Sequence, residues 1–162
     1  MSPRDTTTGG VLEAMVVPAL VQGGYEVQKQ VNVGTRLGGG RHVVDAIAAK
    51  NGERFLVSLK WQQTSGTAEE KVPFEILCLA DAVRTGEYSE AYLVLGGEGW
   101  KRRAYFMSKE MAGLLKDSDK VHVLTLEGFV ALANNGGLGL AAAPTREDAE
   151  EAASVTEEGA GH

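Results

Sequence analysis

Apolar and polar residues follow one another along the chain with periods that predict both strands and helices. Residues 25–33 alternate apolar and polar side chains, as expected for a half-buried strand. Continuous apolar runs predict strands buried on both faces, at residues 43–48, 55–59 and 91–95. Asn51-Gly52 lies between the first two runs and favours a tight hairpin turn. A last short strand is predicted at residues 121–124.

Apolar residues at helical spacing predict helices between these strands. The first helix follows the threonines at positions 6–8, is bent or ended by Pro18, and stops at Gly23-Gly24. A second helix runs from residue 67 to Gly86. Two shorter helices are predicted at residues 109–116 and 126–133, and a further short strand at residues 104–106.

This order of elements predicts an α/β fold with a mixed central β-sheet flanked by helices on both faces. The 162 residues are enough for one domain with a packed core and too few for two ordinary domains. We expect one α/β domain over residues 1–137, with a glycine-rich loop at residues 34–40. Residues 138–162 are rich in Ala, Glu and Gly and are expected to form a flexible acidic tail.

The net charge of −6 at first argues against an acidic partner such as nucleic acid. Six of the acids but only one of the bases, Arg146, follow residue 143, so residues 1–143 are nearly neutral with 16 acids and 15 bases. Charge therefore neither supports nor excludes a nucleic-acid partner.

Cys78 is the single cysteine of the chain, so a disulfide within the chain is excluded. It lies in an apolar run, where a buried reduced thiol is the expected state. The absence of a long apolar run and of a leader-like start makes a cytoplasmic protein without membrane contact the expectation. His42, His122 and His162 lack the spacing of a zinc site.

Asp45 and Lys60 are the strongest candidates for chemistry. The predicted hairpin would place this carboxylate and this amine on neighbouring strands, and acids follow on the next helix. Carboxylates bind a hard cation such as Mg²⁺, which polarises a phosphate, and a nearby lysine orients water or balances charge. A charged residue such as Asp45 within an apolar run also needs a partner.

Asp45, the run Ser58-Leu59-Lys60 and the order of elements resemble the PD-(D/E)XK nuclease superfamily, over residues 9–126. Val44 stands where the motif often has proline, and Ser58 stands where it has its second acid. In one branch of restriction endonucleases that acid lies on the following helix. Here the matching positions are, in order of preference, Glu75, Glu70 and Glu69.

The resemblance implies a role for each candidate residue. Asp45 and Glu75, with Glu70 as the alternative acid and a backbone carbonyl near Leu59, would bind Mg²⁺, and Mn²⁺ would substitute. Lys60 would assist the attacking water, with Gln62 and Glu13 in supporting roles. No small organic cofactor is implied.

Nucleic-acid contacts are expected from two basic stretches. Lys101, Arg102 and Arg103 form the densest basic cluster, beside Trp100, although a solvated turn explains the cluster equally well. Arg41 and His42 follow the glycine-rich loop and could approach a phosphate, although an ordinary loop histidine remains the alternative for His42.

The leading hypothesis is a Mg²⁺-dependent DNA endonuclease that acts as a homodimer, because cleavage of both strands calls for two sites. The alternative is a catalytically degenerate protein of the same fold that binds DNA or assembles with partners, since Ser58 replaces an acid. A small-molecule enzyme that uses the glycine-rich loop has little support, because the loop lacks phosphate-binding spacing.

Overall fold

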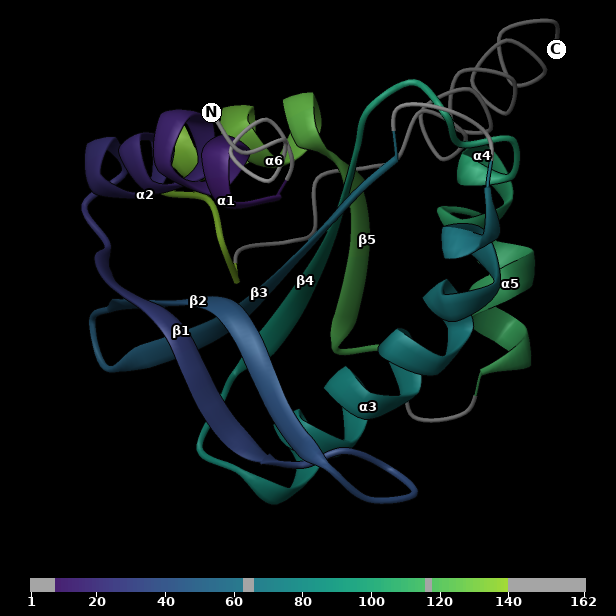
Figure 1. Ribbon diagram of the computed structural model, residues 1–162. Helices are drawn as coiled ribbons and strands as arrows, with labels where there is room; N and C mark the ends of the chain where they lie inside the picture. Colours follow the sequence, from purple (N-terminus) through teal and green to yellow (C-terminus); the bar gives the residue numbers. More distant parts are fainter. Residues whose placement is uncertain (1–7, 63–65, 116–117, 140–162) are drawn as a thin grey trace, which may run out of the picture.

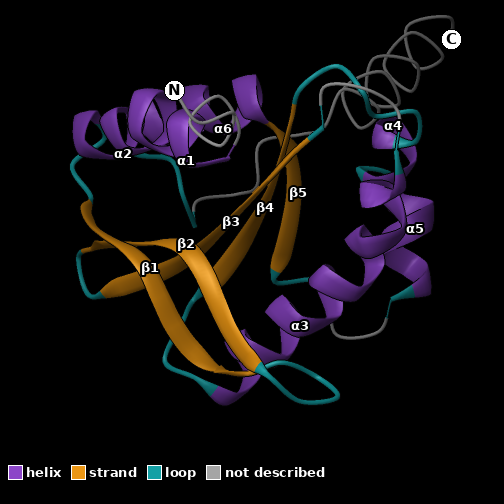
Figure 2. Cartoon of the chain, viewed as in Figure 1, coloured by secondary structure: helices purple, strands orange, loops and turns teal. Residues whose placement is uncertain are grey.

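One five-stranded sheet forms the centre of the computed structural model, which describes residues 8–62, 66–115 and 118–139 (Figures 1 and 2). The strands lie in the order of the sequence, from β1 to β5, with these bounds: β1 (Glu26–Thr35), β2 (Arg41–Lys50), β3 (Glu53–Trp61), β4 (Glu90–Gly96) and β5 (Val121–Thr125). The first three strands pair antiparallel, whereas β3, β4 and β5 pair parallel. The predicted mixed α/β sheet with flanking helices is confirmed.

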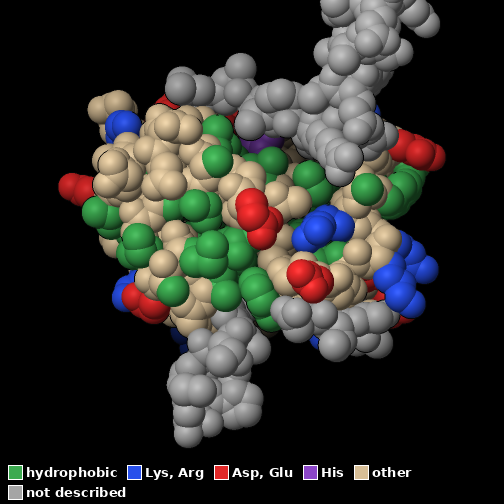
Figure 3. Space-filling view, turned by 90° about the horizontal axis from the view of Figure 1, so that it is seen from above, with side chains coloured by type: hydrophobic (Ala, Val, Ile, Leu, Met, Phe, Trp, Pro, Cys, Tyr) green, Lys and Arg blue, Asp and Glu red, His purple; other side chains and the backbone are tan. Residues whose placement is uncertain are grey.

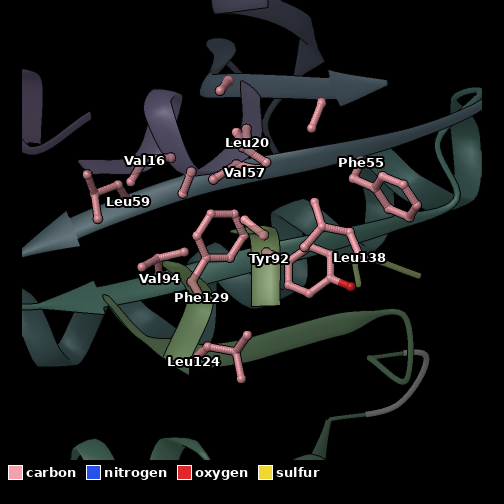
Figure 4. Close-up of a cluster of buried hydrophobic side chains, with 14 of the residues drawn as sticks. Val16, Leu20, Phe55, Val57, Leu59, Tyr92, Val94, Leu124, Phe129 and Leu138 are labelled. Carbon is pink, nitrogen blue, oxygen red and sulfur yellow. The ribbon is translucent and has the colours of Figure 1, made fainter. Parts of the chain in front are cut away.

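One face of the sheet is covered by the two ends of the domain. These are α1 (Thr8–Val11), a π-helical turn η2 (Leu12–Val16), α2 (Val17–Gln22) and α6 (Leu126–Asn134). Pro18 has no N–H to continue the helical ladder, and it lies in the first turn of α2 directly after the π turn. Val16, Leu20, Phe55, Val57, Tyr92 and Phe129 fill the space between these helices and the sheet (Figure 4).

The opposite face carries the crossover helices, which are η3 (Thr67–Lys71), α3 (Val72–Thr85), α4 (Arg103–Phe106) and α5 (Lys109–Leu114). Pro73 lies in the first turn of α3 and Gly86 ends it, as predicted. The prediction of a strand at residues 104–106 is wrong, because these residues form α4, where Phe106 donates to the Arg102 carbonyl at 3.0 Å. Three apolar residues are too few to distinguish a helical from an extended period, and here Phe106 packs as one buried side of a helical turn.

The β2–β3 hairpin closes through Asn51 and Gly52, whose φ angles of 54° and 81° are those of the predicted Asn-Gly turn. Its pairing runs from Lys50 and Glu53 to Ala46 and Val57, and the register goes no further. β2 therefore separates from β3 beyond Ala46, which leaves a gap between the two strands. Asp45 is the first residue of β2 beside this gap.

The described chain ends with two residues that pack on the domain. Leu138 is buried and donates its N–H to the Tyr25 hydroxyl at 2.8 Å, and Gly139 donates to the Tyr92 hydroxyl at 2.9 Å. The first two residues of the expected tail thus belong with the folded part, and residues 140–162 lie outside the described residues. Within the described ranges no helix has the length and apolar character needed to cross a bilayer.

Leu20→Ala tests the packing of the first face. Leu20 is fully buried between α2 and the sheet, so its truncation should lower the free energy of unfolding in urea by about 2–5 kcal/mol. Val21→Ala is the control, because the neighbouring Val21 is 61% exposed and its truncation should change stability by no more than about 0.5 kcal/mol. Equal losses in the two variants would contradict this packing.

Candidate functional site

Asp45 lies where β2 separates from β3. Its Oδ2 accepts the backbone N–H of Leu59 at 2.7 Å, and Gln30 of β1 also forms a side-chain hydrogen bond with this carboxylate. The N–H and C=O of a strand residue point to the same side, so the Leu59 carbonyl also faces the gap that β2 has left. The gap therefore places a carboxylate and a backbone carbonyl side by side.

Glu75 reaches the same side of the sheet from α3. Its side chain is only 3% exposed, and three groups surround the carboxylate. Arg36 donates Nη2–H to Oε2 at 2.7 Å, while Ser58 Oγ donates to Oε1 at 3.3 Å and His42 Nε2 lies 3.4 Å from Oε1. An ionised carboxylate only accepts hydrogen bonds, so this geometry requires the proton of His42 on Nε2.

The electrostatic environments of the two acids differ. Burial by itself raises the pKa of Glu75, but hydrogen bonds from His42 and Arg36 and the charge of Lys60 outweigh it and lower the pKa to about 2. Burial also raises the pKa of Asp45, and there the Leu59 N–H, the Lys60 charge and Gln30 compensate only in part. The negative charge of Asp45 is thus the less well balanced of the two.

Lys60 interacts electrostatically with both acids. Its positive charge lowers the pKa of both Asp45 and Glu75, and the charge of Glu75 raises the pKa of Asp45. Lys60 follows Leu59 on β3 and, by the alternation of side chains along a strand, lies on the same face as Ser58. The structure thus brings Asp45, Lys60 and Glu75 into one charged cluster.

The other candidate acids lie elsewhere. Glu69 is buried, and its Oε1 accepts the backbone N–H groups of Lys101 and Arg102, the latter at 2.8 Å. Glu70 is exposed in η3. Glu13 is exposed on the first helix and forms an ion pair with Lys29 at 2.6 Å. Of the three helix acids considered for the site, only Glu75 bonds to the strand position that Ser58 occupies.

Gln62 holds the loop that follows β4. Its side chain is buried and donates Nε2–H to the Gly99 carbonyl at 2.8 Å, and Gly99 donates its N–H back to the Gln62 carbonyl at 2.7 Å. Gly97 has φ +90°, and a Cβ there would collide with the backbone of Gln62. Gln62 thus orders this loop, and its expected supporting role in catalysis stays a prediction.

The basic cluster sits on this loop. Glu69 fixes its backbone, Arg103 Nη1 donates to the Gly97 carbonyl at 3.0 Å, and the side chains of Lys101 and Arg102 are exposed. Seen from above, where the carboxyl ends of β3 to β5 lie, Lys and Arg side chains gather over the side of α4 and α5 (Figure 3). The two acids thus have different roles. Glu69 orders the loop that carries Lys101 and Arg102, which we call the basic loop, and Glu75 faces the sheet.

His42 requires a correction. It lies within β2, not in the preceding loop, and its side chain is buried against Glu75. A phosphate of bound DNA could not contact it there, because the ring is already enclosed. Arg41, next to it, is exposed.

The family comparison agrees with this geometry. A family model described as the PD-(D/E)XK nuclease superfamily domain matches residues 4–137. The chain belongs to the PD-(D/E)XK nuclease superfamily. No curated protein matches the chain.

A solved structure similar to this superfamily member is the crystal structure of a protein of unknown function, AF1548. The two share 16% sequence identity with a TM-score of 0.47, over 68% of this chain and 54% of the other. The chain thus spans about half the length of that protein.

PD-(D/E)XK nucleases generally use divalent metal ions, and the donors present here fit one type of site. Among the described residues no group of three or more His, Cys, Asp and Glu side chains could hold a metal. Mg²⁺ does not require such a group, because it keeps several waters and binds through one or two carboxylates. Asp45, Glu75 and the Leu59 carbonyl offer hard oxygen donors of this kind, in a place where a carboxylate charge is incompletely balanced.

Sequence reasoning missed Arg36 and Gln30. Arg36 lies at the start of the glycine-rich loop, bonds Glu75 and lies over the ring of Phe74 at 5.6 Å. Glycine-rich loops give no sign of such a long-range contact. The sequence does hold one sign of the irregularity at Gln30. Lys29 stands at a position where the alternation of Val27 and Val31 calls for an apolar residue, one residue before Gln30.

The pKa of Glu75 predicts a pH dependence of stability. Because its pKa falls from 4.5 to about 2 on folding, the ionised group stabilises the fold above pH 4.5, and this stabilisation is lost as pH falls toward 2. Between pH 5 and pH 3 the wild type should lose about 2 kcal/mol more unfolding free energy than Glu75→Gln, measured by urea denaturation. Parallel pH profiles for the two proteins would show that Glu75 is not held ionised by its neighbours.

Proposed function

We propose that this PD-(D/E)XK superfamily member is a Mg²⁺-dependent endonuclease that hydrolyses phosphodiester bonds of DNA. The observation that carries the proposal is the cluster of Asp45, Lys60 and Glu75, in which the charge of Lys60 lowers the pKa of both carboxylates and the charge of Glu75 raises the pKa of Asp45. A purely apolar core has no need for such a group, because burying charge is costly, and clusters of acids with shifted pKa values are typical of functional sites.

Asp45 and Glu75 would hold the cation, with the Leu59 carbonyl as a third donor and Glu70 left to solvent. When bound, Mg²⁺ supplies a positive charge that polarises the scissile phosphate and lowers the pKa of a nearby water. Lys60 orients the attacking water and balances charge on the phosphate. Mn²⁺, which prefers the same oxygen donors, should substitute.

The ion pair between Arg36 and Glu75 affects how a cation could bind at this site. The guanidinium occupies Oε2 of Glu75 at 2.7 Å, so a cation that approaches Glu75 shares or replaces this pairing. Arg36 belongs to the loop between β1 and β2 and is partly exposed, with 29% of its side chain accessible. A displaced Arg36 would be free to contact the DNA backbone beside Arg41.

The basic loop supplies a second contact with DNA. Lys101 and Arg102 point into solvent from a backbone that Glu69 and Gln62 hold in place, so their charges are presented from a fixed position. Contacts of lysine and arginine with phosphates provide affinity without reading sequence. Cleavage of both strands would require two copies of the site, which a homodimer provides.

A specific observation favours a second candidate function, a degenerate module that binds DNA or assembles without cleaving. Ser58 replaces the strand acid, and Glu75 already accepts hydrogen bonds from Arg36 and Ser58 and lies beside His42. If these partners hold Glu75 permanently, Asp45 alone would bind metal weakly. Metal binding therefore separates the two candidates.

Asp45→Asn and Lys60→Ala test the proposed endonuclease. Each should reduce Mg²⁺-dependent nicking of supercoiled plasmid by at least about 100-fold, since each removes a group that stabilises charge in the transition state. Asp45→Asn should also abolish Mn²⁺ uptake measured by calorimetry, while circular dichroism and thermal unfolding show an intact fold.

Asp119→Asn and Lys120→Ala are the matched controls, because both residues are exposed just before β5, at the other end of the parallel strands. Undiminished nicking in Asp45→Asn or Lys60→Ala would reject the assignment. A wild type that binds DNA but takes up no Mn²⁺ and cuts nothing would favour the degenerate module.

The double variant Lys101→Ala/Arg102→Ala tests the basic loop. Loss of two phosphate contacts should weaken binding to a DNA duplex and lower the slope of log affinity against log salt by about 2. Arg84→Ala/Lys120→Ala removes the same charge from exposed residues at the opposite end of the sheet and should leave the slope unchanged. Equal slopes for wild type and the loop variant, measured by fluorescence anisotropy, would remove this loop from the DNA interface.

A further inference from the structure

Gln30 faces Asp45 across the β1–β2 hairpin. Lys29 pairs with Ala46 and Val31 pairs with Val44, so Gln30 and Asp45 occupy the intervening positions. Gln30 has φ +52°, in the left-handed region that side chains other than glycine rarely adopt. The hairpin is therefore irregular at the level of the candidate metal site.

Both strands change faces at this point. On β1, Val27 packs with the core under α2 and α6, whereas Val31 packs with the core under α3. On β2, Ala46 packs on the first side and Val44 on the second. Residues two apart share a face in a regular strand, so the alternation slips by one residue at Gln30 and Asp45.

Asp45 lies at this change of face. Val44 and Ile47 are three residues apart and would lie on opposite faces of a regular strand, but both belong to the core under α3. The Asp45 carboxylate accepts the Leu59 N–H in the gap where β2 leaves β3.

The strain at Gln30 has no local explanation. The other described non-glycine residue with positive φ is Asn51, whose Asn-Gly turn requires that conformation. Gln30 lies in the middle of a strand, and strained backbone of this kind is typical of functional sites. Its side chain forms a hydrogen bond with the Asp45 carboxylate, which adds a second group to the Leu59 N–H.

We propose that Gln30 is a positioning residue that orients the Asp45 carboxylate for a divalent cation. The inference rests on the proposed function, since it assigns Gln30 to the metal site proposed there. In this role the amide and the Leu59 N–H together restrict the rotation of the carboxylate, whose further lone pairs can bind a cation. Partners of this kind around metal ligands typically contribute 10- to 100-fold in metal affinity.

Gln30→Gly separates positioning from structure. Glycine adopts a positive φ without strain, so the variant should fold with unchanged or higher thermal stability, but it lacks the amide that holds Asp45. We expect Mn²⁺ affinity, measured by calorimetry, to fall by about 10-fold or more. Hydrogen exchange of the Leu59 amide, followed by NMR with no metal added, should become faster because its acceptor is less fixed.

Gln28→Gly is the matched control, since Gln28 is an exposed glutamine of the same strand that pairs with Ile47. It should lower stability somewhat and leave both Mn²⁺ affinity and Leu59 exchange as in the wild type. Wild-type Mn²⁺ affinity and wild-type Leu59 exchange in Gln30→Gly would overturn the inference while the proposed function stands. A wild type without Mn²⁺ uptake would instead overturn the proposed function and, with it, the role of Gln30 in metal binding.

Discussion

The separation of β2 from β3 at Ala46 is the feature on which the rest of the site depends. The hairpin pairs regularly from its Asn-Gly turn to Ala46 and Val57, and there the ladder hydrogen bonds stop. The Leu59 N–H would be an unsatisfied buried donor at this point, and the Asp45 carboxylate accepts it at 2.7 Å. A polar side chain thus replaces a strand partner, and the same contact that completes the sheet also fixes a charged group at its opening.

Burying two carboxylates destabilises the fold locally, and the neighbouring groups compensate more fully for Glu75 than for Asp45. Glu75 is nearly enclosed, yet hydrogen bonds from His42 and Arg36 and the charge of Lys60 hold its pKa well below the ordinary value. Asp45 has fewer partners, and burial raises its pKa despite the Leu59 N–H. Asp45 is therefore the acid whose charge the proposed cation would balance most, and a cation that retains most of its water needs few further protein ligands.

The sequence predicts the fold and part of the site, for identifiable reasons. The turn at Asn51-Gly52 and the apolar runs depend on local chemistry, so the sheet and its helices follow from the pattern. Asp45 stands out because a charge within an apolar run needs an explanation. The contact of Arg36 with Glu75 spans 39 residues and is not encoded by residue type at neighbouring positions. The irregularity at Gln30 is a backbone angle, and its one sign in the sequence is the break of alternation at Lys29. Residues 104–106 form a helical turn because tertiary packing of Phe106 decides where local preference is weak.

The distribution of acids on η3 and α3 shows how helical geometry assigns roles that composition leaves open. Val72, Ile76 and Leu79 define the face of α3 that packs on the sheet, and Glu75 lies three residues after Val72 and four before Leu79, on that face. Glu70 lies outside this stripe and is exposed. Glu69, one position earlier, turns to the backbone amides of Lys101 and Arg102, where an acid orders a loop whose side chains are basic. Spacing relative to the apolar stripe therefore favours Glu75 over its neighbours as the acid that accompanies Asp45, and it explains why an adjacent glutamate of identical chemistry contributes to a different surface.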